Sequence, residues 1–539
     1  MRDDRPPTAD AGGEDDERGR HLARSTLLVM GLFVASKLVG LLRDRAIASR
    51  FGVSDDYDAY VAAFRVPDLL FTLLAGGALI SAFLPVFAAR LAEDDRAGAW
   101  RVASGMTNLV LAATGASALA AAVWAHPLAE WVAPGFTPEQ VALTASLMRW
   151  LLISTIVFAV SGLQMGMLNA FQHFLSPALA PIVYNAGLLL GALVFAPALG
   201  IHGLALGAII GALGHLTIKV PSLVARGARW SPILGLYDPD VRRVLWLMWP
   251  RVIALGTVQA VFIVNTRLAS GIESGALSSL NYAWLISQMP QTILGTAVGT
   301  VVFPTLAALA ARRDAGALRA TATRSLGALA LVSIPAAALL AALAGPVVGL
   351  LLQTGRFDAA AAAATATALR WFALGLAAHV AFEVVARLYY AQQDTLTPLG
   401  LAAAAMGLNV ALAYALVRPM GVGGLALANS LAVTAEVALG LWLLRHRLGA
   451  VDGRSLAATS VRALVAGAAA ALVGGAVAAW PVPLGADGGP LSGPFAASAL
   501  RVALGGTLGG GAALAVLSVV ARQDLLAGWR LVRRRPSAR

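Results

Sequence analysis

The sequence predicts an all-α integral membrane protein with about fourteen transmembrane helices, arranged as two parallel six-helix repeats followed by two accessory helices. The first observation is composition: the chain is 58% hydrophobic and 13% charged, whereas soluble domains are about half apolar and about a quarter charged. The second is that apolar stretches of about 20 residues, enough to cross a hydrocarbon core as a helix, recur along nearly the whole chain. These stretches do not alternate as barrel strands do, and a backbone in lipid must bond with itself, so we expect helices.

The third observation is an internal duplication. Four pairs of segments recur with spacings of 221, 221, 219 and 220 residues: 170–177 with 391–398, 200–206 with 421–427, 83–85 with 302–304, and Gly135 with Gly355. Nearly constant spacing at four places indicates a duplicated half. Since each half holds six helices, an even number, both halves enter the membrane in the same direction. Parallel repeats of this kind are typical of transporters whose substrate path runs between the halves.

Glycine and proline residues punctuate the chain between the predicted helices. The helices are expected at 25–50, 58–90, 98–133, 138–170, 176–198, 201–226, 240–270, 275–311, 317–353, 359–391, 396–417, 422–446, 459–480 and 497–521. The first six form an N-terminal lobe (25–230), the next six a C-terminal lobe (231–450), and the last two an accessory segment (451–525). Residues 1–24 are expected to be a disordered cytoplasmic tail, and residues 526–539 a basic cytoplasmic tail.

The net charge is +12, and the distribution of the basic residues is explained by membrane orientation rather than by a nucleic-acid site. Arginines gather in the even-numbered connections, at 90–101, 226–243, 312–324 and 445–454, and no Lys or Arg stands between 102 and 148. By the positive-inside rule, these connections and both termini face the cytoplasm. No nucleic-acid partner is therefore expected.

The sequence also excludes several kinds of chemistry. It contains no cysteine, so a disulfide, a thiolate nucleophile and an iron–sulfur cluster are impossible. The histidines are scattered without metal-ligand spacing, so no metal site is expected. No loop carries a nucleophile elbow, a phosphate loop or a paired-carboxylate motif. We expect no catalytic residues, no cofactor and no enzymatic activity.

Ionisable residues inside the predicted helices are the candidate site. A charge at membrane depth costs a few kcal/mol, so it normally faces a polar cavity or a partner. Lys37 and Arg43 on the first helix are six residues apart and therefore about 120° apart around its axis. Both can point into one anion-attracting cavity, with Asp44 beside them. The alternative is that Arg43, Asp44 and Arg45 mark a frayed helix end at the membrane interface, and that the Lys37 side chain extends toward that interface.

The second helix is expected to be bent or broken, and breaks at membrane depth usually line a cavity. Asp58 and Arg65 are seven residues apart on one face of this helix, so an internal ion pair is the alternative to a cavity role. The supporting or gating residues of this helix are Asp58, Pro67, Asp68, Gly76 and Gly77.

Later helices add fewer charges. Arg267 on the seventh helix has no local partner in the sequence and is a further cavity candidate. Glu383 and Arg387 on the tenth stand at i, i+4, a spacing that favours a structural pair. Runs rich in small residues, such as 505–511, are expected to pack helices closely.

Several motifs together resemble one known family, the MurJ/MviN lipid II flippases of the multidrug/oligosaccharidyl-lipid/polysaccharide exporter superfamily. They include Ser-Lys-Leu-Val-Gly-Leu-Leu-Arg-Asp at 36–44 and Phe-Arg-Val-Pro-Asp-Leu-Leu at 64–70. The others lie at 51–52 with 58–60, at 133–136, and at 389–391 with 394–398. All run in family order, from the first helix to the start of the eleventh.

The resemblance implies a V-shaped pair of six-helix lobes around a central cationic cavity, with two extra helices that form a groove for a prenyl tail. The implied substrate is lipid II, an undecaprenyl-pyrophosphate precursor of the cell wall, moved outward across the bacterial cytoplasmic membrane by alternating access. The substrate-binding candidates are then Lys37, Arg43, Arg65 and Arg267, because a pyrophosphate needs cations in a water-excluded cleft. Other implied partners are membrane lipids and cell-wall synthesis proteins.

The resemblance also implies coupling to Na⁺ or to the membrane potential, for which Asn265, Asp394 and Asn409 are polar candidates. The chain departs from the family pattern at two cavity arginines, where Phe71 and Leu285 stand instead. Two alternatives therefore stay open. One is a flippase or exporter for another lipid-linked oligosaccharide or a drug, and the other is a transport-inactive membrane scaffold.

Overall fold

The computed structural model describes residues 11–481 and 494–521. These residues form helices, with no β-strand among them, which confirms the predicted fold class. In chain order the elements are α1 (Ala11–Phe51), α2 (Asp55–Ala63), α3 (Arg65–Leu74), α4 (Gly77–Ala92), α5 (Arg96–Val123), α6 (Ala125–Val132), α7 (Pro138–Ala170), α8 (Leu175–Leu190), η1 (Gly191–Phe195), α9 (Ala196–Leu199), α10 (Ile201–Thr217), α11 (Val220–Val224), α12 (Pro239–Ala269), α13 (Ala276–Ala311), α14 (Ala315–Ala342), α15 (Ala344–Leu352), α16 (Ala359–Ala391), α17 (Leu396–Met420), α18 (Val422–Leu448), α19 (Gly453–Ala479) and α20 (Pro494–Val520).

Every predicted helix has a helical counterpart, but the number fourteen is not confirmed. Among the described residues, eleven helices are long and apolar enough to cross a membrane. Several predicted helices are interrupted; the second, for example, is divided into α2, α3 and α4. Helix α1 begins at Ala11 rather than at residue 25. The predicted basic tail at 526–539 lies outside the described residues.

The chain divides into two compact units. Unit 1 contains the residues up to Ile47, Val66–Val123 and Leu147–Leu255, and unit 2 contains Ala48–Arg65, Trp124–Ser146 and everything from Gly256 onward. Two short segments of the first repeat thus belong to the unit that holds the second repeat. The lobe boundary expected at residues 230 and 231 stays a prediction.

Hydrogen bonds show why unit 2 includes those two segments. The Arg356 N–H donates to the Ser49 carbonyl oxygen over 2.8 Å, and the Gly135 N–H donates to Ser270 Oγ over 3.2 Å. A Cβ atom on Gly135 would lie 2.4 Å from the Ser270 carbonyl oxygen, so only glycine permits this approach.

The backbone repeats with the spacing that the sequence shows. The four non-glycine residues with positive φ in the described chain form two pairs whose members are 219 and 221 residues apart, and two pairs of positive-φ glycines are 221 and 222 residues apart. The pairs are Asp94 with Arg313 (55° and 55°), Gln172 with Gln393 (53° and 60°), Gly200 with Gly421 (58° and 55°), and Gly227 with Gly449 (76° and 58°). Because a left-handed conformation is costly for a residue with a Cβ atom, its recurrence at equivalent places supports the duplication.

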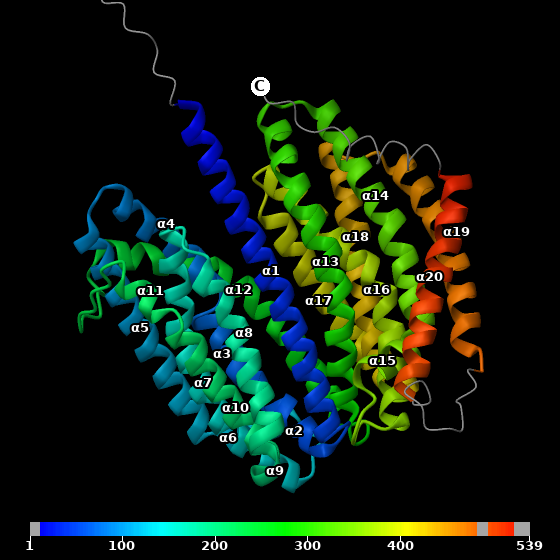
Figure 1. Cartoon of the computed structure of the whole chain (residues 1–539), viewed down its shortest axis with the longest axis horizontal. Coiled ribbons are helices and arrows are strands. Elements are labelled where there is room, and N and C mark those ends of the chain that lie inside the picture. The colour runs from blue at the N-terminus through cyan, green and yellow to red at the C-terminus, as the bar shows by residue number, and fades with distance from the viewer. Residues whose placement is uncertain (1–10, 482–493, 522–539) are drawn as a thin grey trace, which may run out of the picture. The chain divides into compact units, whose positions relative to one another are not determined.

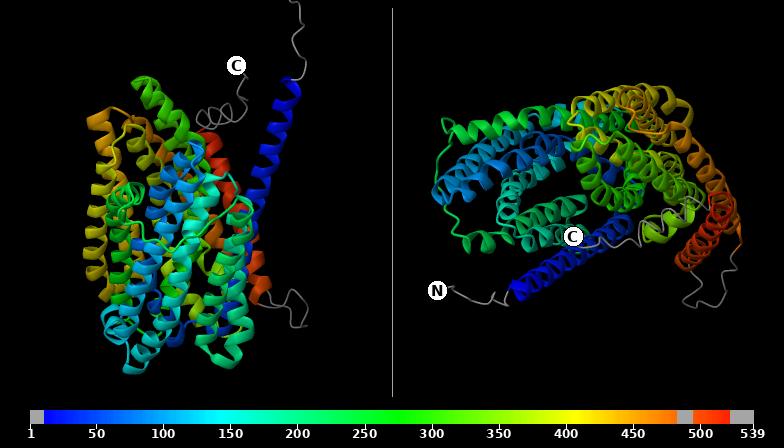
Figure 2. Two further views of the ribbon diagram at one scale, coloured as in Figure 1. Left: turned by 90° about the vertical axis from the view of Figure 1, so that its left-hand side faces the viewer. Right: turned by 90° about the horizontal axis from the view of Figure 1, so that it is seen from above.

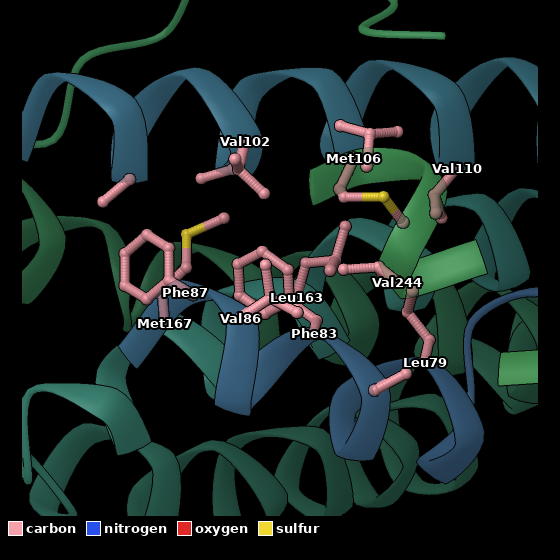
Figure 3. Packing of buried hydrophobic residues seen from close by; sticks show 14 of the residues in the cluster. Leu79, Phe83, Val86, Phe87, Val102, Met106, Val110, Leu163, Met167 and Val244 are labelled. Carbon is pink, nitrogen blue, oxygen red and sulfur yellow. The ribbon is translucent and has the colours of Figure 1, made fainter. Parts of the chain in front are cut away.

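Unit 1 has a core of large apolar side chains (Figure 3). Phe83 and Phe87 of α4 stack with ring centroids 5.1 Å apart, and they pack against Met106 of α5 and Leu163 of α7. These four side chains are fully buried, so the three helices share one core.

Helices α8 and α10 of unit 1 lie side by side and approach at glycines (Figures 1 and 2). A Cβ atom on Gly207 would lie 2.6 Å from the Gly187 carbonyl oxygen and 2.6 Å from Gly191 Cα. Gly203, Gly207 and Gly211 recur every four residues, the spacing that brings membrane helices into close contact.

The two C-terminal helices of unit 2, α19 and α20, pack beside α14 (Figure 1). Cβ atoms on Gly474 and Gly509 would lie 2.6 and 2.7 Å from the Leu339 side chain. Gly505 and Gly509 therefore provide the close packing expected for this run, whereas Gly510 faces open space.

We predict that Gly207→Ala destabilises the protein by about 1–3 kcal/mol, because the added methyl group must push two helix backbones apart. The measurement is the melting temperature of the detergent-purified chain. Gly407→Ala is the matched control, since a Cβ atom on this helical glycine meets nothing within 4 Å. Equal melting temperatures for the two variants would contradict the packing argument.

Candidate functional site

Arg43 is a partly buried cation on α1 of unit 1. Its Nε and Nη2 atoms donate to Asp44 Oδ1 over 2.9 and 2.6 Å, and Nη1 donates to Asn185 Oδ1 of α8 over 2.7 Å. The Asn185 amide in turn donates to the Ser36 carbonyl oxygen over 3.3 Å. The guanidinium is therefore held in place by a carboxylate and an amide, and its side chain is 19% exposed.

Lys37 differs from Arg43 in its surroundings. It is exposed, and its Nζ atom lies 5.5 Å from the centroid of the Phe33 ring on the same helix. On α1, Arg43 is thus held by hydrogen bonds, whereas Lys37 lies over an aromatic ring. That both serve one anion site stays a prediction.

The predicted break in the second helix is confirmed. Gly76 has an extended backbone and precedes α4 as its N-cap, and the chain is also interrupted between α2 and α3. Asp68 lies in the first turn of α3 and Pro67 is buried beside it. A Cβ atom on Gly76 would lie 3.2 Å from the Thr72 carbonyl oxygen, whereas one on Gly77 would meet nothing within 4 Å.

Asp58 of α2 caps the N-terminus of α13 within unit 2. Its carboxylate accepts from the Gly275 N–H over 2.9 Å, from the Ser278 N–H over 2.6 Å, and from the Ser278 hydroxyl. Asp58 is 2% exposed. These donors, not Arg65, are its partners, so the internal ion pair considered from the sequence does not form.

Unit 2 contains a cavity of about 280 Å³. Its aromatic wall includes Phe262, Trp284 and Phe372, and Trp284 lies 5.3 Å from Phe372 between ring centroids. The polar residues around it are Arg65, Asn265, Thr266, Asn281, His379, Asn409, Asn429 and Glu436. A cavity with apolar walls and a few convergent polar groups is the usual form of a ligand site.

Some of these polar residues have hydrogen-bond partners and others do not. Arg65 Nε donates to Thr266 Oγ1 over 2.8 Å and lies over the Phe262 ring. Within the described chain, Asn265 Oδ1, Glu436 Oε1 and both amide atoms of Asn409 have no partner. Asn409 is 3% exposed. Unpartnered buried polar atoms are costly, so oxygen atoms facing this cavity are available to a ligand.

Two of the candidates lie elsewhere in unit 2. Arg267 donates to the Trp131 carbonyl oxygen, and its guanidinium lies 5.7 Å from the centroid of the Trp131 ring. Asp394 accepts from the Thr397 N–H over 2.9 Å at the start of α17. Neither lines the cavity.

The predicted structural pair on α16 is confirmed. Arg387 Nη1 lies 2.6 Å from Glu383 Oε2, at the i, i+4 spacing. No group of three His, Cys, Asp or Glu residues that could hold a metal ion occurs in the part of the chain that the structure describes.

Phe71 stands at one of the two positions that depart from the family pattern, and its surroundings are apolar. The Phe71 ring contacts Phe158 edge to face, with centroids 6.0 Å apart, and it packs against the apolar core of unit 1. On α13, Trp284, which precedes Leu285, lines the cavity of unit 2. Neither position supplies a positive charge.

Sequence reasoning missed several polar residues of the membrane helices. Asn185 and Glu436 are isolated polar residues in apolar runs, a pattern that could have identified them. Lys219 is fully buried, and its Nζ atom donates to the Ser161 carbonyl oxygen over 2.5 Å and to Ser161 Oγ over 2.7 Å. His215 completes this group with a 2.7 Å contact from Nδ1 to Ser161 Oγ. Only the fold brings these three side chains together.

Comparison with known proteins gives consistent results. The family model described as lipid II flippase MurJ matches residues 47–482. The lipid II flippase MurJ of Burkholderia cenocepacia is 30% identical over 418 residues, covering 76% of this chain and 80% of that protein. A probable lipid II flippase MurJ of Bdellovibrio bacteriovorus is 29% identical over 444 residues, covering 81% and 84%.

Solved structures share the fold. A lipid II flippase MurJ in an inward closed conformation has a TM-score of 0.77 at 21% identity, covering 93% of this chain and all of that one. An inward-facing multidrug resistance MATE family transporter of the MOP superfamily has a TM-score of 0.65 at 14% identity, covering 79% and 98%.

We predict that Asp58→Ala lowers the free energy of unfolding by about 2 kcal/mol, because it leaves the N-terminal N–H groups of α13 without an acceptor. The measurement is thermal unfolding of the purified chain. Asp56→Ala, an exposed acidic residue of the same helix, is the control and should change little. A loss of similar size in both variants would argue against the cap.

Proposed function

The chain belongs to the lipid II flippase MurJ family, and we propose that it moves lipid II, a lipid-linked cell-wall precursor, from the cytoplasmic to the outer leaflet. The observation that carries this proposal is the family match over residues 47–482. The internal duplication supports transport by alternating access, because two repeats of one fold can rock against each other. No covalent chemistry is required.

The geometry around Arg43 supports recognition of a pyrophosphate. A guanidinium presents several N–H donors in a planar fork that matches phosphate oxygens. Asp44 and Asn185 now accept those bonds, so a phosphate group would bind by replacing one of them. Lys37, about one and two-thirds turns earlier on α1, would add a second positive charge.

We place the protein in the bacterial cytoplasmic membrane with both termini in the cytoplasm. The support is the distribution of arginine, which is dense at 90–101 and 226–243 and absent between 102 and 148. Positive loops stay on the cytoplasmic side during insertion.

We also propose that transport is coupled to Na⁺ or to the membrane potential, with Na⁺ held in the cavity of unit 2. The fit rests on the donor atoms: Asn265 Oδ1, Asn409 Oδ1 and Glu436 Oε1 are oxygens without partners that line one cavity. Hard cations prefer such oxygen ligands. Asp394, which caps α17, is not part of this set.

The function is tested by complementation of a bacterium depleted of its own lipid II flippase. We expect the parent and Arg50→Ala to restore growth, and Arg43→Ala to fail at equal membrane expression. Arg50 is the matched control because it is an exposed arginine in the last turn of the same helix. Growth with Arg43→Ala would contradict the role of this cation, and failure of a well-expressed parent would favour another lipid-linked substrate or a scaffold.

The ion site is tested by thermal unfolding in NaCl compared with choline chloride. A ligand that binds the folded state raises its stability, so Na⁺ should raise the melting temperature of the parent. Asn409→Leu should lose most of that rise, and Gln288→Leu, an exposed amide of α13, should keep it. A full Na⁺ response in Asn409→Leu would refute the site.

A further inference from the structure

A second pocket, the arginine pocket, opens on unit 1 with a volume of about 670 Å³. Its lining includes Arg96, Trp100, Arg101, Arg226, Arg229 and Trp230. One candidate membrane span begins at Arg96, and another ends at Val224, just before the pocket. The pocket therefore lies where two helices leave the hydrocarbon region.

Nearby acidic groups neutralise the arginines of this pocket only in part. Arg101 Nε lies 3.5 Å from Asp238 Oδ2, and Arg226 Nη1 donates to the Ser222 carbonyl oxygen over 2.7 Å. Within the described residues, Arg96 and Arg229 form no ion pair. Burial, together with the positive charge of Arg226, lowers the pKa of the nearby His173 imidazole.

The pocket wall formed by the segment after α11 is held rigidly against α5. Ser104 Oγ donates to the Arg229 carbonyl oxygen over 3.2 Å and accepts from the Ser231 N–H over 3.1 Å. Asn108 Nδ2 donates to the carbonyl oxygens of Ser231 and Ile233 over 2.7 and 2.8 Å. A preformed site loses less entropy when it binds a ligand.

The indole of Trp230 is both fixed and exposed. Its Nε1 atom donates to Asn108 Oδ1 over 2.8 Å, yet 68% of the residue is open to the surroundings. Tryptophan is enriched at membrane interfaces, where its ring lies at the level of the lipid headgroups. An exposed indole fixed beside the pocket is therefore suited to contact with lipid headgroups.

We infer that the arginine pocket binds the phosphodiester headgroup of an anionic phospholipid. Guanidinium groups match phosphate oxygens with paired N–H donors, and basic pockets at the ends of membrane helices bind anionic headgroups. The site is separate from Arg43 and from the cavity of unit 2, so it goes beyond the proposed transport function. A bound lipid would anchor the α4–α5 connection and the segment after α11 to the same membrane surface.

The test is native mass spectrometry of the full chain in detergent, titrated with phosphatidylglycerol or phosphatidylcholine. We expect the parent to bind phosphatidylglycerol more tightly than phosphatidylcholine. The double variant Arg96→Gln with Arg229→Gln should weaken phosphatidylglycerol binding about tenfold or more, since each arginine near the surface contributes to anionic lipid binding. Both side chains are exposed, so the variant should fold.

The matched control is Arg312→Gln with Arg319→Gln, which removes the same charge from exposed arginines at the α13–α14 connection. It should retain the parent's affinity. The inference is overturned if the two double variants behave alike, if phosphatidylcholine binds as tightly as phosphatidylglycerol, or if millimolar inorganic phosphate displaces the lipid. The last result would assign the pocket to a soluble phosphate compound.

Discussion

The buried carboxylate of Asp58 is the interaction on which the arrangement of unit 2 depends. A helix that begins inside a protein exposes N–H groups without intrahelical partners, and at α13 this carboxylate accepts from two of them and from Ser278 Oγ. Because α2 comes from the first repeat and α13 from the second, the cap joins the two halves of the sequence. Trp284, also on α13, lines the cavity of unit 2, so the cap helps to position one wall of this cavity.

Two arginines of the membrane helices, Arg43 and Arg65, are held by hydrogen-bond partners, whereas Lys37 is exposed. Arg43 is bonded to Asp44 and Asn185, and Arg65 is bonded to Thr266. Such pairing offsets much of the cost of a charge in a low-dielectric region. The same pairing limits how tightly Arg43 could bind a phosphate, because the phosphate must displace Asp44 or Asn185. The binding free energy is then the difference between the new hydrogen bonds and those that are lost.

Buried polar side chains of the two units differ in how fully they are hydrogen-bonded. In unit 1, the fully buried Lys219 donates to Ser161 and contacts His215 Nδ1. In unit 2, Asn409 and Glu436 face a cavity with unsatisfied atoms. Lys219 is thus enclosed by its partners, whereas Asn409 and Glu436 keep unpartnered atoms beside a cavity.

The helical membrane fold, the duplication and the break in the second helix could be predicted from the sequence, because apolar length, repeat spacing and Gly or Pro positions are read from the order of residues without knowing any contact. The sequence also identified Arg43 and Asn409 as unusual polar residues. Only the tertiary structure decided which partners the charged side chains have. Asp58 contacts α13 rather than Arg65, Arg267 contacts Trp131, and Arg43 contacts Asn185. These partners depend on which donor and acceptor atoms the packing of the helices brings to within about 3 Å, the range over which hydrogen bonds form.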